Sequence, residues 1–252
     1  MMRYSAFITG FLSLFALFWV APASAQDINL SDLLPAGQAS ASGRIIQYVM
    51  ILTVLSLAPG ILIMVTSFTR FVVALSFLRS GIGLQTTPAN IILISLALFM
   101  TFYVMAPTFD TAWKNGLQPL IKEQITEEVA YEEMTKPFRR FMLDNVREKD
   151  LVLFDDLAVS AFNYEKDAPI EELDLRVLIP AFMISELRRG FEIGFLIALP
   201  FVVIDMIVAT ITMSMGMMML PPTVISLPFK VLFFVLIDGW YLLTGGLIRS
   251  FT

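Results

Sequence analysis

The sequence predicts an all-α fold in which kinked, membrane-associated helical hairpins flank an inserted helical domain rich in charge. Two observations support this prediction. Of the 252 residues, 57% are hydrophobic and only 15% are charged, whereas soluble domains are usually close to a quarter charged. The apolar residues also gather into four long stretches that are interrupted by one charged segment. Such stretches must face lipid or a large protein interface.

The first segment has the three parts of a secretory signal peptide. Arg3 supplies the positive charge, residues 7–20 form an apolar core, and Ala25 ends a small-x-small cleavage sequence. A membrane span is the alternative, but it needs about 20 apolar residues and this core is shorter. We therefore expect a signal peptide over residues 1–25, followed by a flexible leader over residues 26–44 that is rich in Ser, Ala and Gly.

The four apolar stretches predict two hydrophobic helical hairpins, over residues 45–109 and 190–252. Between the hairpins, residues 110–189 hold 17 of the 22 acidic residues and 11 of the 17 basic residues. Arg70 and Arg79 lie in the short connection within the first hairpin, and the positive-inside rule places that connection in the cytoplasm. We therefore expect residues 110–189 to form a charged periplasmic domain. The apolar stretches themselves run over residues 45–68, 90–109, 193–213 and 220–248.

The charged domain is predicted to be helical because its apolar residues recur at i, i+3 and i+4. One such set is Leu117, Leu120, Ile121 and Ile125, and a second is Phe138, Phe141, Met142 and Val146. The acidic residues between the two sets are expected to form a solvated face, with a contact to a neighbouring subunit as the alternative; they are Glu127, Glu128, Glu132 and Glu133.

Prolines lie inside or at the ends of every apolar stretch. Each proline removes a backbone donor and kinks a helix. Broken helices in membrane proteins usually line a cavity or pack inside an assembly. The sequence therefore predicts broken hairpins rather than straight spans, at Pro59, Pro107, Pro200, Pro221, Pro222 and Pro228.

Several charged residues lie beside or within the apolar stretches: Glu186, Glu192, Asp205, Lys230 and Asp238. A charge near the bilayer centre costs roughly 2.5–3.5 kcal/mol on insertion scales. Lys230 and Asp238 are about 12 Å apart along a helix axis and cannot easily neutralise each other. We expect Lys230 to form a buried interface pair with an acid from another segment or subunit, with Glu186 as the first candidate. Two alternatives stay open: a proton relay through Asp205 and Asp238, and snorkelling of these side chains to water.

A run of methionines precedes two prolines at the tip of the second hairpin: Met213, Met215, Met217, Met218 and Met219. Methionine is unbranched and packs around irregular shapes. A soft apolar loop of this kind could close a pore as a hydrophobic constriction, and several subunits would together form a deformable ring. The alternative is that these residues fill a membrane core.

Composition also excludes several function classes. The chain contains no cysteine and no histidine, so it lacks thiolate chemistry, disulfides and the commonest general base and metal ligand. It has no Walker-type nucleotide-binding loop, and its net charge of −5 disfavours nucleic acid as a partner. We expect neither enzymatic activity nor a cofactor.

Several long segments match a known family. They are LSLAPGILIMVTSFTR from Leu55, LALFMTFYVMAP from Leu96, LIPAFMISEL from Leu178, GMMMLPP from Gly216, ISLPFK from Ile225 and DGW from Asp238. In these segments the chain resembles the FliP family of flagellar biosynthetic proteins and its injectisome counterparts. The resemblance covers about residues 48–251. Small departures are Ala89, where the family often has proline, and the pair Arg188 and Arg189, where it often has one basic residue.

The resemblance implies a role in a protein export gate. FliP-like proteins form a ring of five subunits, assemble with FliQ and FliR, and adjoin FlhB and FlhA in the flagellar basal body. The ring is the channel through which unfolded flagellar proteins cross the bacterial inner membrane. The resemblance implies that Met217 to Met219 form a gasket around the closed pore. It favours an interface pair of Glu186 and Lys230 over a proton relay. The alternative function is a proton-coupled transporter that uses Asp205 and Asp238.

Overall fold

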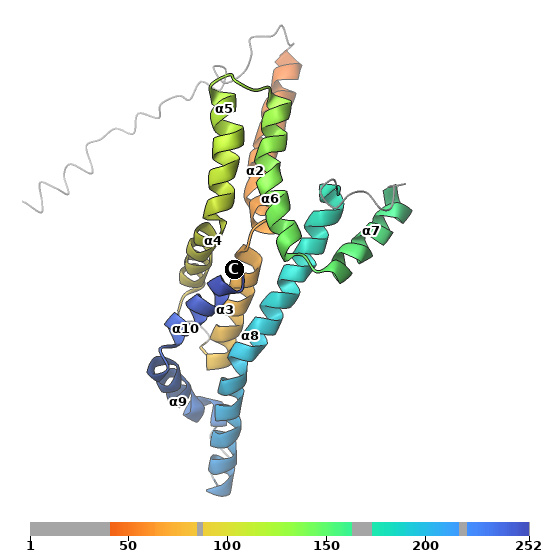
Figure 1. Cartoon of the computed structure of the whole chain (residues 1–252). Coiled ribbons are helices and arrows are strands. Elements are labelled where there is room, and N and C mark those ends of the chain that lie inside the picture. Colours follow the sequence, from red (N-terminus) through yellow and green to blue (C-terminus); the bar gives the residue numbers. More distant parts are fainter. Residues whose placement is uncertain (1–40, 85–87, 163–172, 217–220, 252) are drawn as a thin grey trace, which may run out of the picture. The chain divides into compact units, whose positions relative to one another are not determined.

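The computed structural model of the chain describes residues 41–84, 88–162, 173–216 and 221–251, and all regular structure in these ranges is helical (Figure 1). The predicted all-α class is therefore confirmed. The predicted signal peptide over residues 1–25 and most of the predicted leader lie outside the described residues. The chain divides into two compact units after Thr53; the described part of the first unit is the beginning of the first helix, and all further contacts below lie within the second.

The helices follow one another without intervening strands in the described ranges. In chain order they are α2 (Ala41–Met64), α3 (Phe68–Ile82), α4 (Asn90–Ala112), the π-helix η2 (Trp113–Leu117), α5 (Gln118–Ile121), α6 (Glu127–Asn145), α7 (Glu148–Phe162), α8 (Leu175–Ser214), α9 (Pro222–Leu236) and α10 (Gly239–Arg249).

The connection predicted within the first hairpin is itself a helix. α3 begins at Phe68, so Arg70 lies in its first turn and Arg79 in its last turn. Its side chains Phe71, Leu75 and Leu78 are buried at the i, i+4 and i+7 positions of one face. The segment is therefore longer and more ordered than the short connection expected, because the positive-inside rule counts charges near apolar segments and says nothing about the backbone that carries them.

α8 is a single helix of 40 residues that contains both Pro180 and Pro200. It runs across the expected boundary between residues 189 and 190, just as α4 runs across the boundary between residues 109 and 110. The break expected at Pro200 is absent. Apolar membrane helices tolerate proline because neighbouring helices and local backbone adjustments satisfy the backbone groups that it frees.

The last apolar stretch is broken between α9 and α10, and not at Pro228, which lies inside α9. The chain bends by 65° at this break. Asp238 lies at the break in the left-handed region, with φ 53° and ψ 51°, a conformation that few residues other than glycine adopt. Gly239 follows against the ring of Phe234, and a Cβ atom there would lie 2.3 Å from that ring. The break therefore depends on this tight turn.

The main core lies around α3, which packs along α8 and also contacts α4 and α9 (Figure 1). Small residues let α3 and α8 approach closely. A Cβ atom at Gly190 would lie 3.0 Å from Val73, and one at Gly194 would lie 2.7 Å from Phe77. Small residues spaced by four are a common packing device of membrane helices. The buried members of this core are Phe68, Phe71, Ala74, Leu75, Leu78, Ile82, Ala97, Met100, Phe201, Phe234, Leu243 and Leu247.

A second core joins α6 to α8. Met142 packs with Leu178 and Phe182 of α8, and the other members of its predicted apolar face, Phe138, Phe141 and Val146, lie against this cluster. The predicted helical periodicity of this segment is thus confirmed. Three of the four acidic residues on the predicted solvated face are exposed and Glu133 is half-buried.

Much of the apolar surface is uncovered in the single chain. Two stretches of helix in the described residues are long and apolar enough to cross a membrane, Asn90–Ile121 and Leu175–Ser214. The number rises to four if the pairs α2–α3 and α9–α10 each count as one bent span. Only 11% of the apolar window in α8 is buried. Lipid or other protein must therefore cover these helices.

Candidate functional site

The most deeply buried charges form a pair between α3 and α8. The Nε atom of Arg70 donates to Oε2 of Glu186 at 2.9 Å, and its Nη2 atom donates to Oε1 of the same carboxylate. The two side chains are 1% and 0% exposed. This bidentate geometry satisfies both charges in an apolar setting, where an unpaired charge would be very costly.

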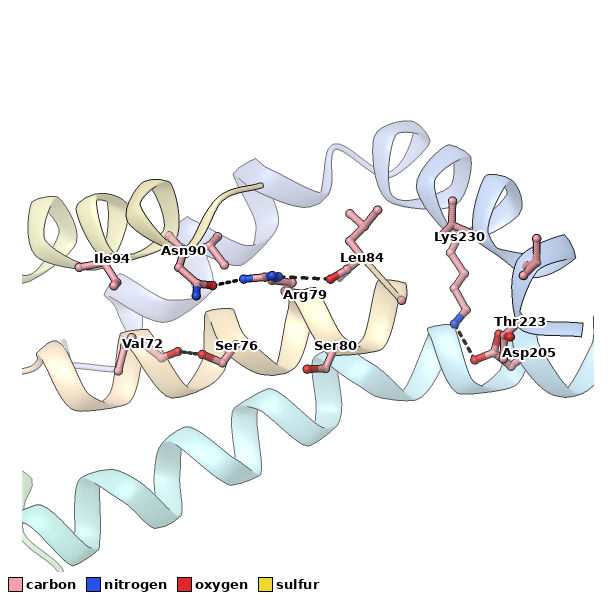
Figure 2. A pocket seen from close by; sticks show the side chains of 14 residues that line it. Val72, Ser76, Arg79, Ser80, Leu84, Asn90, Ile94, Asp205, Thr223 and Lys230 are labelled. Atoms are coloured by element: carbon pink, nitrogen blue, oxygen red, sulfur yellow. Dashed lines mark hydrogen bonds and ion pairs between the residues drawn. The ribbon is translucent and has the colours of Figure 1, made fainter. Parts of the chain in front are cut away.

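A second ion pair joins α9 to α8 (Figure 2). Nζ of Lys230 donates to Oδ2 of Asp205 at 2.5 Å and to the carbonyl oxygen of Gly81 at 3.0 Å. The hydroxyl of Ser226, one turn before Lys230, donates to Oδ1 of Asp205 at 2.5 Å. Lys230 is 5% exposed and Asp205 is 32% exposed, so only the carboxylate reaches the surface.

The expected pair of Glu186 with Lys230 is wrong. Both residues are buried in the single chain, and each has a different partner. α3 packs along α8 and brings Arg70 to Glu186. α9 packs against a later part of α8 and brings Lys230 to Asp205. The prediction that Lys230 needs an acid from another segment, made from the cost of burying an unpaired charge, is correct. The register of the helices makes that acid Asp205 and not Glu186.

The Lys230–Asp205 pair lies at the edge of an open cavity of about 1180 Å³ between α3, α4, α8 and α9 (Figure 2). Arg79 lines the opposite part of the cavity. Its Nε atom donates to the carbonyl oxygen of Leu84 at 3.2 Å, and its Nη1 atom donates to Oδ1 of Asn90. Hydroxyl groups complete the polar lining, from Ser76, Ser80 and Thr223.

The remaining charges of the apolar stretches lie at the surface. Glu192 accepts a hydrogen bond from Nε of Arg188 at 2.8 Å, and both side chains are more than half exposed. Asp238 is exposed at the α9–α10 break, and its side chain does not cap α10. The structure therefore does not bury Asp238, and it assigns Asp205 to an ion pair.

Outside the apolar helices, a polar cluster fixes the start of α7 to α8. The Arg147 guanidinium donates to both carboxylate oxygens of Asp150, at 2.9 and 2.8 Å. The buried Ser185 hydroxyl donates to Oδ2 of Asp150 at 2.6 Å. Burial acts to raise the pKa of Asp150, but the bonds from Ser185 and Arg147 outweigh it and hold this pKa below its ordinary value.

The methionine run begins at Met213 in the last turn of α8 and continues along the chain towards α9. Met213 and Met215 are exposed, at 56% and 67%, and Gly216 follows with φ 74°. Met217, Met218 and Met219 lie outside the described residues. The described part of the run thus presents its methionines outward rather than into the chain's own core.

Two features of this site were missed in the sequence. Arg70 was assigned to the short connection of the first hairpin, although an arginine close to apolar residues such as Phe68 and Phe71 signals a buried partner. The small residues Gly190, Gly194 and Ala198 recur every four positions and signal close helix packing. Within the described ranges, no group of His, Cys, Asp and Glu side chains could hold a metal ion.

Buried ion pairs that join apolar helices, with most of their apolar surface left uncovered, define a helical protein of the membrane-associated class. A profile of the FliP family matches residues 51–247. The flagellar biosynthetic protein FliP of Rhizobium meliloti (strain 1021) is 59% identical over all of both chains. That of Agrobacterium fabrum is 64% identical over 84% of this chain and 86% of its own, and that of Bacillus subtilis is 49% identical over 82% and 91%. The chain belongs to the FliP family.

Proposed function

We propose that this protein is a pore-forming subunit of the flagellar type III protein export gate, and that it conducts unfolded flagellar proteins across the bacterial inner membrane. The observation that carries the proposal is the methionine run, which begins in the last turn of one apolar helix, precedes the next and lies inside the segment matched to the family. In this proposal, Met213, Met215 and Met217 to Met219 seal the closed channel.

The uncovered apolar surface supports assembly into a larger complex. Exposed hydrophobic residues line the second half of α8 and much of α9, including Phe195, Leu196, Ile207, Val235 and Leu236. A single copy cannot cover this surface, and a ring of identical copies can do so with repeated contacts. We therefore propose a homo-oligomer, a pentamer on the family pattern, that also binds FliQ, FliR, FlhB and FlhA.

The chemistry of methionine suits a gate for unfolded substrates. Such substrates differ in sequence, so specific hydrogen bonds cannot serve all of them. A flexible apolar ring excludes water and ions and still adapts to any extended chain. The same proposal places residues 110–189 in the periplasm and the complex in the flagellar basal body.

The alternative of a proton-coupled transporter gains little support from the geometry. Asp205 is bound by both Lys230 and Ser226, and Asp238 lies at an exposed turn. A relay would require Asp205 to release its lysine in every cycle. Replacing Asp238 with asparagine tests this alternative, because export that persists in the variant excludes a relay through that carboxylate.

Replacing Met217, Met218 and Met219 with alanine tests the gate. We expect a several-fold rise in ion leakage through membranes that contain the assembled complex, because the smaller side chains leave the constriction open. The matched control is Met206→Ala, which removes an exposed methionine of α8 outside the run and should leave leakage unchanged. An intact ion barrier in a fully assembled triple variant would contradict the proposed gate.

A further inference from the structure

The segment that follows α10 folds back onto the buried Arg70. The Nη1 atom of Arg70 donates to the carbonyl oxygen of Ser250 at 2.8 Å and lies 3.0 Å from the Ser250 hydroxyl oxygen. The opposite edge of the guanidinium is held by Glu186. Ser250 therefore binds Nη1, the one guanidinium nitrogen that the ion pair with Glu186 leaves open.

The next residue, Phe251, places its ring in a cage of three side chains. The guanidinium carbon of Arg70 lies 3.5 Å from the ring centroid. The ring of Phe71 meets it edge-on at 5.4 Å, and the ring of Phe141 stacks on it at 5.9 Å. A cation over an aromatic face and paired aromatic rings each add attraction beyond simple apolar burial.

The cage is fixed by contacts that do not involve Phe251. Glu186 holds Arg70 from α8, and Asn145 at the end of α6 accepts from Nη2 of Arg70 at 3.5 Å. Phe71 belongs to the main core, and Phe141 packs edge-on against Phe182. Side chains from α3, α6 and α8 thus build a preorganised pocket, and preorganisation lowers the entropic cost of binding.

We propose that Arg70, Phe71 and Phe141 form a binding site for a Ser-Phe pair, which the chain fills with its own Ser250 and Phe251. The Ser250 carbonyl and hydroxyl satisfy the guanidinium edge, and the Phe251 ring provides the aromatic face. Occupancy of this site holds α10 against α3 and α6. The site is independent of the proposed export function.

Cysteine accessibility tests the site directly, because the chain has no cysteine of its own. Leu247 of α10 is 1% exposed, so a Leu247→Cys reporter in the full-length chain should react slowly with a maleimide while α10 is docked. Adding Phe251→Ala should raise the labelling rate by about tenfold or more, as expected for loss of a packed aromatic side chain. Tyr241→Ala, an exposed position on the same helix, is the matched control and should change nothing.

Conservative variants distinguish this site from plain apolar packing. Phe251→Tyr keeps the aromatic face and should label slowly. Phe251→Leu keeps an apolar side chain without a π face and should label faster, even if Phe251→Ala fails to fold. Equal labelling of the Leu and Tyr variants would overturn the proposal. A second reporter, Ala158→Cys, lies at a buried position of α7 in another cluster. If Phe251→Leu accelerated labelling of this reporter as much as that of Leu247→Cys, the whole fold would be destabilised, and the proposal would also be overturned.

A consequence for the gate rests on the proposed function. α9 and α10 follow the methionine run, so the site fixes one arm of that connection. We expect Phe251→Leu to increase ion leakage through the assembled complex. Faster labelling without leakage would leave the binding site standing and remove only its link to the gate, whereas unchanged labelling would overturn the site itself.

Discussion

Two carboxylates of α8, Glu186 and Asp205, each neutralise a cation from a different helix. They are 19 positions apart, which is about 28 Å along a helix axis. Glu186 binds Arg70 of α3 with both partners almost fully buried, whereas Asp205 binds Lys230 of α9 and is 32% exposed. The two pairs therefore fix α3 and α9 at different positions along α8. Loss of one partner should cost more in the buried Arg70–Glu186 pair than in the partly exposed Lys230–Asp205 pair.

Glu186→Leu should destabilise the protein by about 3–5 kcal/mol, because it leaves Arg70 charged and buried without its carboxylate. The double variant Glu186→Leu with Arg70→Met should recover part of this loss. Thermal unfolding of the purified protein measures both effects. Glu192→Leu is the control, because its exposed pair with Arg188 contributes about 0–1 kcal/mol. Similar melting temperatures for Glu186→Leu and the control would contradict the expectation.

The Asp150 cluster predicts a pH-dependent stability contribution. The pKa of this carboxyl is lower in the folded state than in the unfolded state, so its contribution is present above the unfolded pKa, about 3.9, and is lost as the pH falls through the folded pKa. The difference in melting temperature between the native protein and Asp150→Asn should be largest near neutral pH and shrink below about pH 4. A difference that stays constant into acid would show that the charge is not responsible.

Among the elements, the most extensive contact in the described residues is that between α3 and α8. Gly194 lies so near Phe77 that a Cβ atom would meet the side chain at 2.7 Å. Gly245 of α10 has nothing within 4 Å of the same position. The two glycines therefore offer a matched comparison of a packing requirement with an ordinary helical position.

Gly194→Ala should destabilise the protein by about 1–3 kcal/mol because it forces α3 and α8 apart. Gly245→Ala should instead be neutral or stabilising, by up to about 1 kcal/mol, because alanine restricts the unfolded chain. Thermal or denaturant unfolding of the two variants measures the contrast. A loss at Gly245 equal to that at Gly194 would show that close packing is not the cause.

Helix-scale features could be predicted from the sequence far better than contacts between helices. The spacing of Phe138, Phe141 and Met142 predicts the buried face of α6, because periodicity is local information. The cost of a buried charge predicts that Lys230 needs an acid. Whether that acid is Glu186 or Asp205 depends on the register of α3 and α9 along α8, which side-chain packing sets. The site at Phe251 likewise depends on contacts between residues that are distant in the sequence. Arg70 and Ser250, for example, are 180 positions apart.

On the scale of the whole molecule, the uncovered apolar surface is the dominant feature. Phe195 and Ile207 of α8 are 59% and 53% exposed. They lie in a helix whose apolar segment is largely uncovered by the rest of the chain. Charged segments such as α6 carry single exposed apolar residues instead, including Tyr131. The first kind of position requires lipid or another subunit, and the second does not.

Ile207→Asp should therefore disrupt insertion or assembly, since a charge in an apolar span costs roughly 2.5–3.5 kcal/mol. Tyr131→Asp, on the charged helix α6, should be tolerated. Carbonate extraction of membranes and the size of the complex on native gels measure the two outcomes. Normal insertion and a full-size complex for Ile207→Asp would mean that this face of α8 contacts water.

The length of α8 gives the molecule a lever. Forty residues in one helix span about 60 Å, twice the hydrocarbon thickness of a bilayer. Ser185, 29 residues before the end of α8 at Ser214, is bound to α7 through the Asp150 cluster, and the far end of α8 carries Met213, the first methionine of the run. A rotation of about 5° about Ser185 would move the end of the helix, about 44 Å away, by about 4 Å. A small tilt of α8 at its contact with α7 would therefore displace the start of the methionine run by a distance comparable to the length of a side chain.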